Sequence, residues 1–278
     1  MNTGTLNRLA AFTHTPEGGN PAGVWIGDTL PESDEMQRIA AEVGYSETAF
    51  IAPRVGANRS VRYYSPEAEV PFCGHATIAS GVALGEANGD DTYLLATAVG
   101  EIPVVVRSVN NTKVASLTSV PPKYELASEA LVNKALGLLG WAAEDLDNSI
   151  PPARAFAGNW HLVLAVSSKG RLDELQYDFE KLKLLMIGDD LTTLQLVWRE
   201  SGDVFHSRNP FPVGGVIEDP ATGAAAAALG GYLREANLVS TPNTLTIHQG
   251  VAMGRPSRIE VTIPIIGGIV VTGSAVRI

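Results

Sequence analysis

The chain has 278 residues, of which 45% are hydrophobic and 18% charged, a composition typical of a globular protein and not of a disordered one. Its length suits one large domain or two smaller ones. The formal net charge of −10 argues against nucleic acid as a partner, because an acidic surface gains nothing from a phosphate backbone. The single cysteine, Cys73, excludes an internal disulfide, a cysteine-based zinc site built from several thiols and a two-thiol catalytic pair.

Neither end of the chain carries a membrane signal. Residues 1–12 lack a basic segment followed by an apolar run, so we expect no signal peptide. The apolar stretch at 261–276 is interrupted by Pro264 and by glycines, and it is too short to cross a bilayer. We therefore expect a protein of the reducing cytoplasm with no membrane partner.

Short strands are expected along the whole chain, where segments rich in Val, Ile, Thr or aromatic residues are bounded by Gly, Pro, Asn or Asp. In the first half they are expected at 22–26, 48–52, 61–64, 92–97 and 102–106. In the second half they are expected at 113–118, 153–157, 161–166, 193–198, 244–248 and 258–263. The spacing of apolar residues predicts amphipathic helices at Ser33–Val43, 128–138 and 179–186.

Two further helices are expected where the chain contains an internal repeat. Gly74–Asn88 aligns without a gap on 223–237, with Gly, Ala, Leu, Glu and Asn at matching positions. Both segments are small and apolar for most of their length, and a helix that is apolar all round is buried. Asp219 is expected to cap the second helix, with Pro220 at its first position. The offset of about half the chain indicates two similar halves, each with a curved sheet wrapped around its buried helix.

The starts of these two helices are candidate binding sites. Free backbone N–H groups there bind anions such as carboxylates, and two such starts could converge on one ligand; ordinary capping is the alternative. His75 is either a hydrogen-bonding group of a site or a packed histidine. Glu47 leads into an apolar strand, where a carboxylate is paired, functional or exposed at the strand end. Cys73 is most simply a small buried residue. The other histidines show no metal-ligand spacing, so we expect no metal.

Five segments occur in order between positions 19 and 257: GNPAGV at 19–24, SETAF at 46–50, PEAEVPFCGHAT at 66–77, EDPATG at 218–223 and QGVAMGRPS at 249–257. Together they resemble the phenazine-biosynthesis-like (PhzF-like) isomerase/epimerase family. The resemblance implies the α/β diaminopimelate-epimerase fold, with two pseudo-symmetric halves, each a β-barrel wrapped around a central buried helix, and an active site in the cleft between them. We expect the halves at 1–112, completed by 268–278, and at 113–267. The resemblance also implies a homodimer.

The resemblance implies a cofactor-free isomerase that moves a proton on a small carboxylate substrate. Glu47 would be the general acid/base, and His75 and Asp219 would complete the catalytic set. Substrate contacts are implied for Asn20, Ser46, Gly74, Ala76, Thr222, Gly223 and Ala224. The family usually has Ser where Ala224 stands, so a hydroxyl is lost while the backbone N–H groups of Gly223 and Ala224 remain. Two alternatives stay open: a non-catalytic module of the same fold that binds a small ligand or a protein, and a racemase or epimerase of an amino-acid-like substrate.

Overall fold

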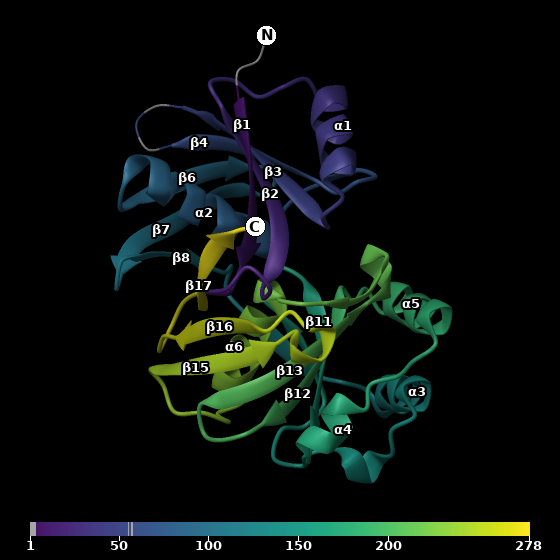
Figure 1. Ribbon diagram of the computed structural model, residues 1–278. Helices are drawn as coiled ribbons and strands as arrows, with labels where there is room; N and C mark the ends of the chain where they lie inside the picture. Colours follow the sequence, from purple (N-terminus) through teal and green to yellow (C-terminus); the bar gives the residue numbers. More distant parts are fainter. Residues whose placement is uncertain (1–3, 55, 57) are drawn as a thin grey trace. The chain divides into compact units, whose positions relative to one another are not determined.

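The computed structural model describes residues 4–54, 56 and 58–278 and divides into two compact units (Figure 1). Unit 1 contains the chain up to Thr118 together with Thr272–Ile278, and unit 2 is Ser119–Val271. Each unit places a sheet around a central helix, which confirms the α/β fold class with a buried helix in each half.

Unit 1 is a closed barrel, in which eight strands of its described residues pair in the ring order β1, β2, β3, β4, β6, β7, β8 and β17. The last strand of the chain closes the ring, because β17 pairs with both β1 and β8. The pairs β2–β3 and β4–β6 are parallel. The strands of this unit are β1 (Gly4–Ala11), β2 (Asn20–Gly27), β3 (Glu47–Pro53), β4 (Arg59–Tyr64), β5 (Glu69–Val70), β6 (Asp91–Thr97), β7 (Gly100–Val109), β8 (Thr112–Thr118) and β17 (Val270–Arg277).

Helix α2 (Gly74–Asn88) fills the barrel and is buried from His75 to Gly85, at the bounds that the sequence predicts. It packs against β1, β2, β3, β7 and β8. Its small residues allow this close approach: a Cβ atom on Gly81 would lie 2.7 Å from Val104 Cγ1 and 2.8 Å from Ala115 Cβ. Helix α1 (Ser33–Val43), also as predicted, packs on β3 and β4.

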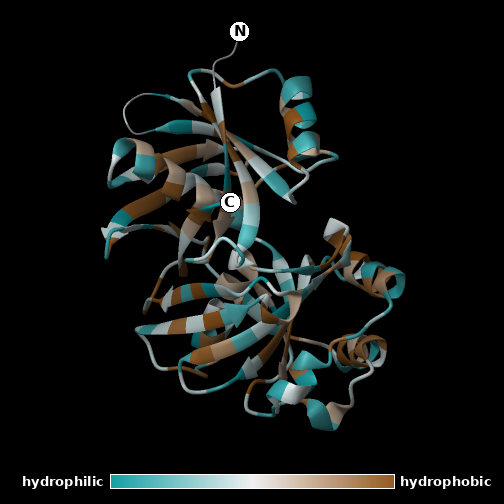
Figure 2. Cartoon of the chain, in the orientation of Figure 1, coloured by the Kyte–Doolittle hydropathy of each residue, from teal (hydrophilic) through white to brown (hydrophobic). Residues whose placement is uncertain are grey.

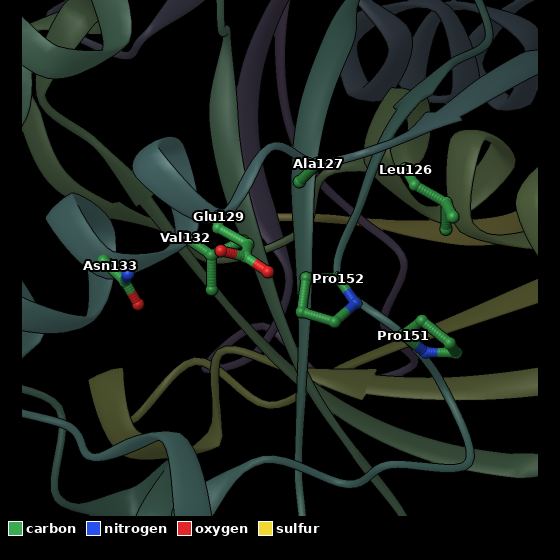
Figure 3. Close-up of a pocket in the computed structure, with 7 residues that line it drawn as sticks. All are labelled: Leu126, Ala127, Glu129, Val132, Asn133, Pro151 and Pro152. Atoms are coloured by element: carbon green, nitrogen blue, oxygen red, sulfur yellow. The ribbon is translucent and has the colours of Figure 1, made fainter.

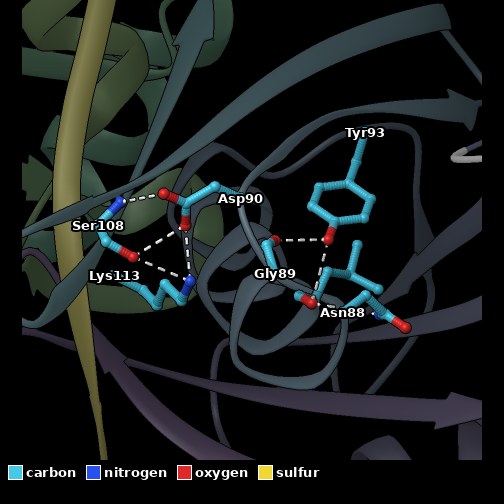
Figure 4. Close-up of polar contacts among 7 residues, drawn as sticks. Asn88, Gly89, Asp90, Tyr93, Ser108 and Lys113 are labelled. Atoms are coloured by element: carbon cyan, nitrogen blue, oxygen red, sulfur yellow. Dashed lines mark hydrogen bonds and ion pairs between the residues drawn. The ribbon is translucent and has the colours of Figure 1, made fainter.

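The C-terminal end of α2 is held by side chains of the strands that follow it (Figure 4). The Tyr93 hydroxyl donates to the Gly89 carbonyl at 2.8 Å. The Asp90 carboxylate accepts from Lys113 Nζ at 2.6 Å and from the Ser108 amide at 2.8 Å. The hydrogen bond from Lys113, followed by that from the Ser108 backbone, lowers the pKa of Asp90 to about 2. These contacts hold Gly89 and Asp90, the two residues directly after α2, against the strands that follow.

In unit 2 a curved sheet surrounds α6 (Gly223–Glu235). Its strands pair in the order β9, β10, β11, β12, β13, β15 and β16, and β14 extends the end of β13. Helix α6 packs against β9, β10, β11, β12 and β16. Apolar and polar residues alternate along β15 and β16 in Figure 2, as expected of strands with one buried face. The strands are β9 (Lys123–Leu126), β10 (Ala153–Phe156), β11 (Trp160–Val166), β12 (Thr193–Arg199), β13 (Val204–Phe211), β14 (Val216–Asp219), β15 (Asn243–Gln249) and β16 (Ser257–Ile263).

Three helices cover the opposite face of β11 and β12, where leucines such as Leu162, Leu164 and Leu194 form a second core with them. They are α3 (Glu129–Leu139), α4 (Lys169–Asp173) and α5 (Phe179–Gly188). The sequence predicts α3 and α5 but not α4, whose five residues are too few to show a helical period. In the described part of the chain, no helix combines the length and the apolar character that crossing a membrane requires.

The expected cap of the second buried helix is wrong. Asp219 is the last residue of β14, and α6 begins at Gly223, with Thr222 in the cap position. The reason lies in Gln249, whose side-chain amide donates to the Asp219 carbonyl at 2.7 Å and accepts from the Thr222 amide at 3.0 Å. These bonds hold residues 219–222 outside the helix, against the local preference of an Asp-Pro pair to start one.

Candidate active site

The start of α2 carries a cluster of four functional side chains from separate segments of unit 1. His75 Nε2 lies 3.4 Å from Glu47 Oε2 and 3.4 Å from Ser46 Oγ. Cys73 Sγ lies 3.4 Å from His75 Nδ1 and 3.9 Å from Nε2. The structure therefore brings together three of the residues that the sequence analysis names for a site, and adds Cys73.

Strand pairing places Glu47 at this end of the barrel. Strands β2 and β3 run parallel, with Ala22 opposite Glu47. Because Asn20 begins β2 and Glu47 begins β3, both residues stand at the same end of the sheet. Asn20 is buried. Sequence patterns alone do not predict which strands are neighbours, so this proximity follows from the topology.

A chain of hydroxyl groups holds Cys73. The Thr77 hydroxyl donates to the Cys73 carbonyl at 2.7 Å. Tyr63 Oη lies 2.7 Å from Thr77 Oγ1 and is the donor of that bond, since Thr77 has already used its own proton. Burial raises the pKa of Tyr63 above its usual range, which keeps this hydroxyl protonated. The residue before α2 is thus tied both to the helix and to β4.

The cluster is buried but not closed. The His75 side chain is 7% exposed and that of Glu47 is 17% exposed, so solvent reaches the carboxylate while the imidazole lies behind it. Gly74 and Ala76 flank His75 in the first turn of α2. Cys73, the residue before α2, makes no side-chain hydrogen bond that caps the helix. Its first N–H groups are therefore of the kind that an anionic ligand binds.

In unit 2, Asp219 belongs to a compact hydrogen-bonded group at the start of α6. The Thr222 hydroxyl donates to Asp219 Oδ2 at 2.5 Å and accepts from Gln249 Nε2 at 2.9 Å. Gly223 and Ala224 form the first turn of α6 directly after this group. The structure thus connects Asp219 with Thr222, two of the residues expected in a site.

Sequence reasoning gives no role to Gln249, although the residue opens the last of the five family segments. The next residue, Gly250, has a φ of +74°, and a Cβ there would lie 2.3 Å from the Arg255 carbonyl oxygen and 2.7 Å from that of Pro220. Only glycine fits this turn. The QGVAMGRPS segment therefore forms a tight turn that presents Gln249 to the backbone on both sides of Pro220.

A layer of buried polar side chains lies on the α6 side of the sheet in unit 2. His161 Nδ1 lies 2.8 Å from Thr193 Oγ1, which also accepts from Asn209 Nδ2 at 3.2 Å. Asn209 is the register partner of Asp219, so the layer reaches the strand end that carries this carboxylate. Burial lowers the pKa of His161 to about 3, which makes the imidazole neutral.

One pocket of unit 2 lies elsewhere, at the start of α3 (Figure 3). Seven residues line it: Leu126, Ala127, Glu129, Val132, Asn133, Pro151 and Pro152. None of these lining residues is among those predicted for a site. With Glu129 as the one ionisable side chain in this lining, the pocket offers little that could move a proton.

Comparison with known proteins identifies the chain. The family described as "Phenazine biosynthesis-like protein" matches residues 9–278. The chain belongs to this family. It is 32% identical to the uncharacterized isomerase YfhB of Bacillus subtilis (strain 168), over 99% of this chain and 97% of that protein. It is also 31% identical to trans-2,3-dihydro-3-hydroxyanthranilate isomerase of Pseudomonas fluorescens, over 90% of this chain and 86% of that protein.

Among solved structures, the PhzF-family phenazine biosynthesis protein of Bacillus anthracis matches with a TM-score of 0.85 and 26% identity, covering 100% of this chain and 97% of that one. The fold and the family are thus supported both by sequence and by structure. This member of the PhzF family is an enzyme, an isomerase that acts on a small molecule.

Proposed function

We propose that this PhzF-family isomerase moves a proton within a small carboxylate substrate, without a cofactor and with Glu47 as general acid/base. The Glu47 carboxylate takes a proton from one carbon of a conjugated substrate, and the electron pair shifts along the π system. The proton then returns from Glu47 to another carbon of the same molecule. A single carboxylate suits such a transfer, because both steps take place on one face of the substrate.

The observation that supports this most is the position of Glu47 against His75. The contact of 3.4 Å between Oε2 and Nε2 orients the carboxylate, and the 17% exposure of the Glu47 side chain leaves it accessible to a ligand. An acid/base group must combine these two properties, since a fully buried carboxylate reaches no substrate and a fully exposed one is not held in position.

We propose that backbone N–H groups at Gly74 and Ala76, at the start of α2, bind the substrate carboxylate. The N–H groups of Gly223 and Ala224, at the start of α6, are proposed as an anion-binding position within unit 2. Neither Cys73 nor Thr222, the residue before each helix, caps its helix through its own side chain, which favours an anionic ligand there. Ala224 has no hydroxyl, so its backbone alone contributes to binding. Asp219 and Thr222 are proposed to form hydrogen bonds with polar groups of the substrate.

The test is proton exchange in heavy water. The purified protein is offered a panel of dihydroaromatic carboxylic acids, including trans-2,3-dihydro-3-hydroxyanthranilate, the compound named for the relative from Pseudomonas fluorescens. Deuterium incorporation and the shift of the double bond are followed by NMR. We expect Glu47→Gln to bind substrate normally and to lose about 10²- to 10⁴-fold in rate, since it keeps the shape and removes the titrating group.

The matched control is Glu86→Gln, which removes a carboxylate of unit 1 that is ion-paired with Arg277 at 2.8 Å, outside the cluster. This variant should retain the wild-type rate. Turnover by Glu47→Gln close to that of the wild type would show that another group carries the proton. Binding without any exchange, by wild type and variant alike, would instead favour a non-catalytic binding module.

One observation favours racemisation as a second candidate. Cys73 Sγ lies 3.4 Å from His75 Nδ1, so a thiol is present beside Glu47 as a further group able to carry a proton. Inversion at carbon requires an acid and a base on opposite faces of the substrate. A racemase would therefore lose activity on substitution of either Glu47 or Cys73, whereas the proposed isomerase depends on Glu47 alone.

A further inference from the structure

We propose that Glu47, Cys73 and His75 form a three-ligand site for a divalent cation that binds thiolate, with Zn²⁺ as the best-suited ion. Occupation of this site would inhibit the enzyme. The sequence shows no metal-ligand spacing, because Glu47 comes from the start of β3 and the other two from the start of α2. Folding alone brings a carboxylate, a thiol and an imidazole together, and their ligand atoms all lie within 4.8 Å of one another.

The distances between the ligand atoms approach those of a tetrahedral zinc site. With Zn–N and Zn–O bonds near 2.0–2.1 Å and Zn–S near 2.3 Å, neighbouring ligand atoms are separated by about 3.3–3.6 Å. His75 Nε2 lies 3.4 Å from Glu47 Oε2 and 3.9 Å from Cys73 Sγ. Because Sγ lies nearer to Nδ1, at 3.4 Å, the Cys73 side chain has to rotate towards Nε2 for all three atoms to bind one ion.

The type and charge of the ligands also select the ion. Thiolate and imidazole favour Zn²⁺ over Mg²⁺ or Ca²⁺, which prefer oxygen ligands. A Cys73 thiolate and a Glu47 carboxylate together balance the two positive charges of the cation. The fourth position of a tetrahedral ion falls to solvent or to the Ser46 hydroxyl, which lies 3.4 Å from His75 Nε2. Entry is open through the exposed part of Glu47.

The site is also rigid before a metal binds. Thr77 and Tyr63 fix the backbone at Cys73, and His75 belongs to a helix that is buried along most of its length. A site whose ligands are already positioned loses little conformational entropy on binding. This distinguishes the cluster from an exposed pair such as His206 and Glu200, whose Nε2 and Oε2 atoms lie 2.7 Å apart on the surface of unit 2.

The binding test uses the full chain, Zn²⁺ and no substrate. Isothermal titration calorimetry of the wild type should show one Zn²⁺ bound at the cluster. Cys73→Ser should weaken it by at least about tenfold, since loss of even a residue behind the direct ligands costs 10- to 100-fold. His206→Ala is the matched control and should leave this affinity unchanged. Equal affinity in Cys73→Ser, or loss of binding in His206→Ala, would overturn the proposal.

A second measurement does not depend on whether any variant folds. Co²⁺ bound by a thiolate gives a sulfur-to-cobalt charge-transfer absorption in the near ultraviolet, and four-coordinate Co²⁺ gives intense bands in the visible. The wild-type protein should show both when titrated with Co²⁺. Binding without the charge-transfer band would exclude Cys73 as a ligand and so reject the site.

Inhibition, unlike binding, rests on the proposed function, because the ion would occupy the carboxylate that carries the proton. Zn²⁺ should inhibit deuterium exchange by the wild type but not by Cys73→Ser at the same concentration. If Zn²⁺ binds at the cluster and exchange continues at full rate, inhibition is rejected and Glu47 is not the proton carrier. If Zn²⁺ fails to bind while Glu47→Gln abolishes exchange, the metal site is rejected and the proposed function stands.

Discussion

Nε2 of His75 lies 3.4 Å from Oε2 of Glu47, although one residue belongs to α2 and the other begins β3. The contact depends on the topology of the barrel. It requires β3 to pair with β2 and the start of α2 to lie at the end of the barrel where β3 begins. The contact makes Glu47 the most suitable proton carrier in unit 1. It also makes Cys73, whose Sγ lies 3.4 Å from His75 Nδ1, the first residue to test.

Cys73→Ser should retain activity within about tenfold of the wild type. This loss is much smaller than the one expected when a general acid/base group is removed. The physical reason is that serine keeps the size of the side chain, while Thr77 and Tyr63 continue to hold the backbone. Values of kcat/KM for deuterium exchange check this. A loss as large as that of Glu47→Gln, in a folded protein, would favour the two-group racemase.

Gln249→Ala should destabilise the protein by about 1–3 kcal/mol, because it leaves buried polar groups of Asp219 and Thr222 without their partner. Chemical denaturation measures this loss. Gln37→Ala is the control, since Gln37 makes a single part-buried bond to the Ser65 carbonyl at 2.9 Å, and it should cost less. Activity should fall with Gln249→Ala as well, as residues 219–222 lose the contacts that keep them outside α6. Equal stability of the two variants would contradict this account of the α6 start.

Two glycines in helices should respond to alanine in opposite ways. Gly81→Ala puts a Cβ 2.7 Å from Val104 Cγ1, so overpacking should cost about 1–3 kcal/mol. Gly137→Ala, at an exposed position of α3, meets no atom within 4 Å and should stabilise by up to about 1 kcal/mol. The midpoints of urea unfolding report both effects. A stabilising Gly81→Ala would mean that the barrel of unit 1 does not enclose α2 as closely as described.

His161 should make the protein acid-sensitive. Its pKa is lowered by burial to about 3, whereas an unfolded histidine titrates near 6.5. Between these values the unfolded chain binds the extra proton, so stability is lost as the pH falls from about 6.5 towards 3, by up to about 1.4 kcal/mol per pH unit. Its partner Thr193 is uncharged, as is Asn209, which donates to Thr193, so neither offsets this.

His161→Gln removes the titrating group, and its stability should therefore fall less steeply with acid than that of the wild type over this range. Urea unfolding of both proteins at a series of pH values checks the difference in slope, in which the contributions of all other titrating groups cancel. Parallel curves would show that His161 is protonated in the folded state.

Local sequence was sufficient for much of the secondary structure. The bounds of α1 and α2 agree with the sequence prediction, because amphipathic spacing marks the first and all-round small apolar residues mark the second. Strands with runs of Val, Ile and aromatic residues, such as β3 and β11, were also found. Strands β1, β5, β9, β13 and β14 were missed. Strand β5 has only two residues, and in the others polar or charged residues interrupt the apolar ones, so that the strands form through pairing with neighbours.

The candidate site, too, could be predicted from the sequence only in part. The resemblance to the family indicated Glu47, His75 and Asp219 as a catalytic set. The residue pattern alone left ordinary packing, exposure at a strand end or helix capping open for them. It did not indicate that Glu47, Cys73 and His75 meet, nor that Gln249 keeps Asp219 out of α6. Those relations join residues far apart in the chain. The first depends on the parallel pairing of β2 and β3, which places Glu47 at the start of α2. The second depends on the Gln249 amide, which forms hydrogen bonds with Asp219 and Thr222. Only the folded chain brings such partners within bonding distance.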